Sequence, residues 1–200
     1  MSNAPTASLT LANALWPAQR SAQPALRFVV LMLLGTVALW LSAKIQVPLW
    51  PVPVTMQTFV VLTLGIAYGW RLAGATMLLY LIEGAVGLPV FAGTWEEGGG
   101  VKHLVGPTAG YLVGFVVAAA VVGRLAERGW DRSPVTAAVA MILGNVVIYG
   151  LGLAWLGAQI GYGPAVQHGL LPFLIGDAIK VVLGAAVLPL AWKALGRRRG

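Results

Sequence analysis

Long apolar runs separated by short polar stretches are the feature that most constrains this chain. A helix needs about 20 predominantly apolar residues to cross the hydrocarbon core of a bilayer, and most apolar runs of this sequence are near or above that length. Of all residues, 58% are hydrophobic and 10% are charged, whereas soluble domains average about 45–50% apolar and about 25% charged residues. The sequence therefore predicts an all-α integral membrane protein.

Six apolar runs predict six transmembrane helices in one bundle. Their approximate bounds are 26–43, 55–68, 72–87, 106–126, 135–160 and 171–194. The second run is short, and we expect the apolar loop before it to lengthen that crossing. The loop itself, 47–53, holds too many prolines for a helix, so it must lie at the surface or pack against protein.

The basic residues predict the orientation of the bundle, because cytoplasmic loops collect Lys and Arg. With six crossings, one side carries only Lys44 and Lys102, and Lys180 lies inside a run. The other side carries ten basic residues: Arg20, Arg27, Arg71, Arg124, Arg128, Arg132, Lys193, Arg197, Arg198 and Arg199. We therefore expect both termini in the cytoplasm, with a segment at 1–24, a membrane domain at 25–195 and a basic tail at 196–200.

The sequence lacks the residues that several classes of function require. The chain has no cysteine, and its two histidines are far apart without the spacing of metal ligands. No Gly-Lys dipeptide occurs, which excludes a Walker A loop, and neither Gly-x-Ser-x-Gly nor His-Glu-x-x-His is present. The basic residues are not interleaved with aromatics as in a nucleic-acid-binding motif. We therefore expect no enzyme activity, no metal, no cofactor and no nucleic acid partner.

Three ionisable residues stand out because they lie away from the ends of the apolar runs, in positions where each costs a few kcal/mol or more and needs a reason. Glu83 lies in the third run, and Asp177 and Lys180 lie three residues apart in the sixth, so that they share a helix face. A carboxylate beside an ammonium suits a cyclic urea or amide, since one accepts N–H groups and the other donates to C=O. A neutral ion pair that only holds helices together is the alternative.

Further polar and aromatic residues are candidates for the same site. Asn145 and Tyr149 lie four apart on one helix face, where helix–helix hydrogen bonding is an equally good interpretation. Phe91 and Trp95 lie in a loop on the outer side and are expected to pack on an apolar ring system. Trp155 either joins them or belongs to an interfacial aromatic belt.

Five motifs in order give the sequence a recognisable resemblance from about residue 28 to 190. They are Val-Pro-Val-Thr-Met-Gln-Thr-Phe at 52–59, Gly-Leu-Pro-Val-Phe-Ala-Gly at 87–93, Gly-Pro-Thr-Ala-Gly-Tyr-Leu at 106–112, Gly-Asn through Tyr at 144–149, and Pro-Phe-Leu-Ile-Gly-Asp-Ala-Ile-Lys at 172–180. The chain resembles the biotin-specific substrate-binding (S) components of energy-coupling-factor transporters, the BioY family. The resemblance implies a six-helix S-component fold in the bacterial inner (cytoplasmic) membrane, with the vitamin held near the outer side under loop lids.

The resemblance also implies ligands and partners. Asp177 and Lys180 are expected to contact biotin, and Lys102 is our candidate for the biotin carboxylate. The sequence departs from the family pattern in the acidic stretch 94–97, where a small, glycine-rich loop is expected. Usual partners are a membrane coupling (T) subunit and two cytoplasmic ATP-binding subunits.

The first run offers Gly35, Ala38 and Ser42 for close contact with a partner helix, although small residues also serve packing inside a chain. A stand-alone proton-coupled or facilitative vitamin carrier is the alternative function, and the acidic residues Glu83 and Asp177 keep it open.

Overall fold

The computed structural model describes residues 10–17, 23–93 and 99–197 of the chain. Within them the fold is helical apart from one small hairpin. The elements are α1 (Leu11–Leu15), α2 (Pro24–Lys44), β1 (Gln46–Val47), β2 (Val54–Thr55), α3 (Gln57–Tyr68), α4 (Trp70–Ala85), α5 (Lys102–Val105), α6 (Ala109–Ala126), α7 (Pro134–Ile160), α8 (Tyr162–Gly169), the 3₁₀ turn η2 (Leu171–Phe173) and α9 (Leu174–Arg197). The all-α prediction is confirmed.

Each of the six predicted runs coincides with a helix, namely α2, α3, α4, α6, α7 and α9. In the part of the chain that the structure describes, four helical stretches are long and apolar enough to cross a membrane: Pro24–Lys44, Ala109–Ala126, Pro134–Ile160 and Tyr162–Leu195. Helix α3 has 12 residues and α4 has 16, which is short for a crossing of about 20. Six crossings therefore stay a prediction.

The expectation that the apolar loop lengthens α3 is wrong. Residues 46–55 instead form an antiparallel hairpin in which Gln46 pairs with Thr55 and Val47 pairs with Val54. Three prolines in 47–53 lack a backbone N–H and cannot continue a helix. Pairing the flanking residues satisfies the backbone groups that a helix would otherwise have bonded.

Helix α6 lies at the centre of the bundle, packed against α3, α4 and α7. Glycines allow this close packing, since a Cβ on Gly114 would lie 3.0 Å from the Cα of Ile148 on α7. Helix α9 packs on α7 and α3, whereas α2 packs on α4 and α3. Large side chains with almost no exposure fill the space between these helices, among them Leu62, Met77, Met141 and Ile148.

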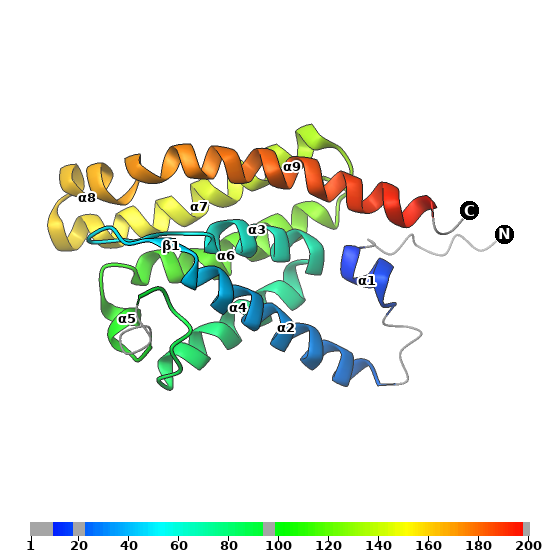
Figure 1. The fold of residues 1–200 in the computed structure, drawn as a ribbon, viewed down its shortest axis with the longest axis horizontal. Helices are drawn as coiled ribbons and strands as arrows, with labels where there is room; N and C mark the ends of the chain where they lie inside the picture. The colour runs from blue at the N-terminus through cyan, green and yellow to red at the C-terminus, as the bar shows by residue number, and fades with distance from the viewer. Residues whose placement is uncertain (1–9, 18–22, 94–98, 198–200) are drawn as a thin grey trace.

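The two ends of the bundle differ in what closes them. Figure 1 shows the hairpin, α5 and α8 toward one end, with α1 and the last turns of α9 toward the other. Helix α1, which the sequence did not predict, packs on α3 and α9. The buried guanidinium of Arg27 holds it by donating to the carbonyl oxygens of Trp16 (2.7 Å) and Ala12 (3.2 Å) and to Asn13 Oδ1 (2.9 Å).

Candidate functional site

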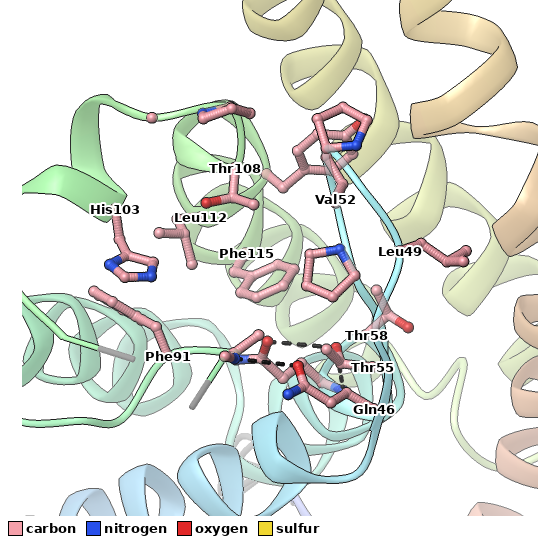
Figure 2. A pocket seen from close by; sticks show the side chains of 18 of the residues that line it. Gln46, Leu49, Val52, Thr55, Thr58, Phe91, His103, Thr108, Leu112 and Phe115 are labelled. Atoms are coloured by element: carbon pink, nitrogen blue, oxygen red, sulfur yellow. Dashed lines mark hydrogen bonds between the residues drawn. The ribbon is translucent and has the colours of Figure 1, made fainter. Parts of the chain in front are cut away.

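A cavity of about 510 Å³ opens at the end of the bundle that carries the hairpin. Its walls come from the hairpin, the start of α3, the loop 91–93, α5, residues 106–108 with the first turns of α6, and the facing residues of α7 and η2. Figure 2 shows Phe91 and His103 on one side, Thr55 and Thr58 below, and Leu112 and Phe115 behind. The volume lies within the roughly 300–1,000 Å³ of small-molecule sites.

The wall at 90–93 is fixed from two directions. Tyr80 Oη donates to the Val90 carbonyl at 2.6 Å, and Lys44 Nζ donates to the carbonyls of Phe91 (2.9 Å) and Gly93 (3.3 Å). The Phe91 ring packs against Gly84 of α4, at a place where any Cβ would overlap it. These contacts hold the buried Phe91 ring in the cavity wall, and its packing on a ligand stays a prediction.

Aromatic rings form part of the apolar wall. Tyr149 lies edge-on to Tyr111 at 6.4 Å and to Phe173 at 6.2 Å between ring centroids. Tyr111 and Phe115 project from consecutive turns of α6, and the Tyr111 hydroxyl donates to the Gly169 carbonyl at 2.9 Å. Rings held in fixed orientations suit a flat or apolar ligand.

A buried polar network lies directly beneath the cavity. Asp177 Oδ1 accepts from Thr58 Oγ1 at 3.0 Å and from Lys180 Nζ at 2.9 Å, while the Tyr149 hydroxyl donates to Oδ2. Asp177 is 4% exposed and Lys180 is 7% exposed. The pair predicted from the sequence therefore forms, and it joins α3, α7 and α9 at one point.

Lys180 uses all its donors inside this network. An ammonium has three N–H groups, and here they go to the Thr55 carbonyl (2.7 Å), Thr58 Oγ1 (2.8 Å) and Asp177 Oδ1. Neither Asp177 nor Lys180 is on the cavity surface, whereas Thr55, Thr58 and Tyr149 are. A ligand that reaches the charged pair must therefore replace one of these internal hydrogen bonds.

Other predicted site residues lie in different places. Lys102 lies on the cavity rim. Asn145 is buried one turn from Tyr149 without lining the cavity, and its Oδ1 has no hydrogen-bond partner among the described residues. Trp95 lies outside the described residues. Trp155 donates from Nε1 to the Gly106 carbonyl at 2.8 Å and is partly exposed, which fits the interfacial alternative.

Glu83 does not line the cavity, and its assignment as a ligand residue stays a prediction. Its Oε1 accepts a hydrogen bond from Thr36 Oγ1 at 3.0 Å, which joins α4 to α2 outside the pocket. The residue lies in the last turn of α4, two residues before this helix ends at Ala85. A polar bond between two helices explains this carboxyl without a ligand.

The small residues of α2 are largely occupied inside the chain. A Cβ on Gly35 would lie 2.6 Å from Thr76 Cγ2 of α4, and buried Ser42 donates to the Leu39 carbonyl at 2.7 Å. Ala38 is half-buried. Packing within the chain, the alternative that the sequence left open, accounts for Gly35 and Ser42, and contact with a partner subunit stays a prediction.

Sequence reasoning missed several residues that line the cavity. They include Tyr111, His103, Thr55 and Gln57, none of which was selected as a candidate. Gln57 is buried and donates from Nε2 to Tyr80 Oη at 2.7 Å. A signal existed, because Gln57 and Tyr111 belong to two of the five motifs. No group of three or more His, Cys, Asp or Glu within the described ranges could hold a metal ion.

The fold and the site define an α-helical membrane protein with a ligand-sized cavity at one end of its bundle. Comparison with known proteins gives the family: the chain matches the BioY family over residues 12–197 and belongs to it. The resemblance seen in the five motifs is thereby confirmed.

Individual relatives agree with this membership. The chain is 38% identical to a biotin transporter BioY of Thermotoga maritima, covering 76% of this chain and 88% of the relative. It is 36% identical to a probable biotin transporter BioY of Pyrococcus horikoshii, covering 73% and 84%. Both are named as transporters, in agreement with the prediction that this chain is not an enzyme.

A solved structure has the same fold. It is a crystal structure of the S-component for biotin from an ECF-type ABC transporter, with a TM-score of 0.75 and 20% sequence identity. The match covers 86% of this chain and 94% of the solved one. The S-component fold predicted from the sequence is therefore confirmed.

Proposed function

We propose that this chain is the high-affinity biotin-binding subunit of an energy-coupling-factor transporter in the bacterial cytoplasmic membrane. The observation that carries the proposal is the buried network of Asp177, Lys180, Tyr149 and Thr58 beneath an aromatic cavity. Biotin combines a cyclic urea, an apolar ring and chain, and a terminal carboxylate. The cavity offers a charged polar end, aromatic walls and a basic rim for these three parts.

The ureido group is assigned to the polar end. Its N–H groups would be accepted by the Asp177 carboxylate, which has oxygens facing Tyr149 and Thr58. Its carbonyl would accept from Lys180 in place of one internal acceptor. If the displaced acceptor is Asp177 Oδ1, a ureido N–H replaces the lost donor there, so that every polar group stays paired as a buried site requires.

The apolar part of biotin is assigned to Tyr111, Phe115 and Phe173, and the carboxylate to Lys102 on the rim. A charged hydrogen bond contributes roughly 1.5–3 kcal/mol. A solvent-exposed lysine gives less than a buried one, because water screens its charge. We therefore expect Lys102 to tune affinity, with the larger share supplied by the buried end.

Binding of radiolabelled biotin to the purified full-length chain tests the proposal directly. Saturable binding with competition by unlabelled biotin is expected. Lys102→Ala should weaken binding, whereas Lys193→Ala, an exposed lysine near the end of α9, should leave it unchanged. Absence of saturable binding to a folded chain would overturn the assignment.

The energy source is assigned to partner subunits, since the sequence has no Walker A loop. Proteoliposomes that contain the chain together with a coupling subunit and two ATP-binding subunits should accumulate biotin when supplied with ATP. A stand-alone carrier predicts accumulation by the single chain under a proton gradient. Glu83, one of the two acids that kept that alternative open, is bonded to Thr36 outside the cavity.

We further propose six crossings with cytoplasmic termini. The basic residues support this orientation, and so does the packing of α1 on α9, which puts both ends of the described chain on one side. Because the chain has no cysteine, single cysteines at Val101 and Arg128 can report the sides. Label that cannot cross membranes should react at position 101 in intact cells and not at position 128, and the reverse pattern would refute the orientation.

A further inference from the structure

The tip of the β1–β2 hairpin presents an apolar surface that nothing in the described chain covers. Trp50 is 81% exposed, the highest value among the large hydrophobic residues of the described ranges. Val47 and Leu49 beside it are also exposed. After Leu49 and Trp50 the chain turns inward, and Pro51 and Val52 are buried. One side of the hairpin therefore lines the cavity while its tip faces outward.

Moving the hairpin tip out of water costs little desolvation free energy, because it carries no charge and few N–H groups. No charged residue occurs between Lys44 and Arg71. Three of the seven residues in 47–53 are prolines, which have no N–H group to desolvate. The pairs Gln46–Thr55 and Val47–Val54 satisfy backbone groups at the base. Unpaired backbone groups are the main obstacle to placing a non-helical segment in a membrane, and the prolines leave only three N–H groups in 48–53, those of Leu49, Trp50 and Val52.

The exposed tip continues the apolar surface of α2. Leu34, Val37, Leu41 and Ile45 are exposed along that helix, and the hairpin begins directly after it. Lys44 does not interrupt this surface, because its ammonium turns inward to the carbonyls of Phe91 and Gly93. The surface that faces lipid along α2 therefore extends without a charge to Trp50.

We propose that the hairpin tip, centred on Trp50, inserts into the headgroup region of the bilayer on the cavity side. Tryptophan is enriched at this depth because its ring is apolar and its N–H is polar. The partner is thus a lipid surface, and it holds one wall of the cavity from outside. A consequence for ligand release rests on the proposed function, since the inner side of the same hairpin lines the cavity at Pro48, Pro51 and Val52.

The depth of the tip can be measured without any ligand. The full chain is labelled with an environment-sensitive fluorophore after Trp50→Cys, Leu34→Cys or Arg128→Cys, each in a protein that has no other cysteine. Nanodiscs are prepared from phosphatidylcholine and phosphatidylglycerol with and without bromine near the top of the acyl chains. Leu34 is the reference for the hydrocarbon, and exposed Arg128 is the reference for water.

Brominated lipid should quench the label at position 50 and not the label at 128, while aqueous iodide should quench 128 and spare 50. Iodide quenching at 50 equal to that at 128, with no effect of bromine, would overturn the proposal. Protection from iodide without bromine quenching, combined with disulfide formation between two Trp50→Cys chains, would also overturn it and assign the surface to a second copy.

The effect on the cavity is measured separately as biotin dissociation. Trp50→Ser should release biotin about threefold or more faster in nanodiscs, with no such difference in detergent, where no bilayer holds the tip. Trp70→Ser, a partly exposed tryptophan at the start of α4, is the matched control. If bromine quenches the label at position 50 but Trp50→Ser releases biotin at the wild-type rate, the tip contacts lipid and this contact does not affect biotin release. Absence of biotin binding in all chains would count against the proposed function alone.

Discussion

Among the described residues two carboxylates are buried, and they lie near opposite ends of α9. Asp177 is 4% exposed and Asp131 is 1% exposed. Asp177 accepts from Thr58, Tyr149 and Lys180, which belong to three helices around the cavity. Asp131 lies in the loop between α6 and α7, where it accepts from Trp192 Nε1 at 2.5 Å and lies 3.3 Å from Arg132 Nε.

Burial alone therefore does not identify a ligand site. The partners of Asp131 form a closed cluster, since the Arg132 guanidinium also lies 3.5 Å from the centre of the Trp192 ring. None of these residues lines the cavity. The Asp177 network touches the cavity through Thr58 and Tyr149, which bond the carboxylate and also line the cavity. The contrast between a network with an open side and one without it is what the following experiments test.

Removing the charge of Asp177 should have the largest effect. In Asp177→Asn a neutral amide replaces an acceptor of charge-assisted hydrogen bonds, which contribute roughly 1.5–3 kcal/mol. Biotin affinity should fall about ten- to a hundredfold or more, as measured by equilibrium binding to the purified chain. Unchanged affinity in a folded variant would mean that Asp177, like Asp131, only joins parts of the chain and does not bind the ligand.

Removing both charges separates ligand binding from folding. The double variant Asp177→Asn with Lys180→Gln leaves no unpaired buried charge, so it should unfold at nearly the wild-type temperature. If the pair serves biotin, this folded protein should still bind it poorly. A double variant with wild-type affinity would show that the pair only joins helices, as Asp131 and Trp192 do.

The hydroxyl of Tyr149 should have an intermediate effect. Tyr149→Phe removes the donor to Asp177 Oδ2 while keeping the ring that lines the cavity. We expect affinity to fall about tenfold, the equivalent of about 1.4 kcal/mol. Tyr111→Phe is the matched control, because its hydroxyl bonds the Gly169 carbonyl and not the network. Equal losses in both variants would argue against a special role for Asp177.

Asp131→Asn should change affinity least and act on stability instead. Burial raises the pKa of Asp131 above 3.8, opposed by the hydrogen bond from Trp192 and the charge of Arg132. A raised folded-state pKa means that the wild type loses stability as pH rises from about 4 toward the raised value. The asparagine can still accept from Trp192 and lacks this titration. Its advantage in unfolding temperature should therefore grow over that pH range, with biotin affinity unchanged.

The helices were predictable because the bilayer imposes a minimum length on apolar runs, and each of the six runs became a helix. The hairpin was not, since strands of two residues leave no alternating pattern to detect. Helix α1 had a local signal, as Thr10 caps Asn13 N at 3.3 Å. Its position depends on Arg27, which was counted only as a topology signal and is in fact bonded to α1.

The same difference between local and distant information explains the site. Asp177 and Lys180 were predictable because both charges, and the spacing of three residues between them, can be read from one short stretch of sequence. Glu83 met the same criterion of a charge in an apolar run, and only the rotation of α4 shows that it faces Thr36. Thr58 carries no charge, so its place between Asp177 and Lys180 depends on how α3 packs against α9.

The contact between Gly84 and Phe91 has a consequence for the choice of ligand. The Phe91 ring occupies the space where a side chain at position 84 would lie, and its other side forms part of the cavity wall. A methyl group at position 84 would push the ring toward the cavity and reduce the room for a ligand. Residue 84 touches no ligand space itself, yet its size can determine how wide a molecule the protein admits. A substitution at position 84, behind Phe91, can therefore change ligand selectivity in related or redesigned chains while every residue that lines the cavity stays the same.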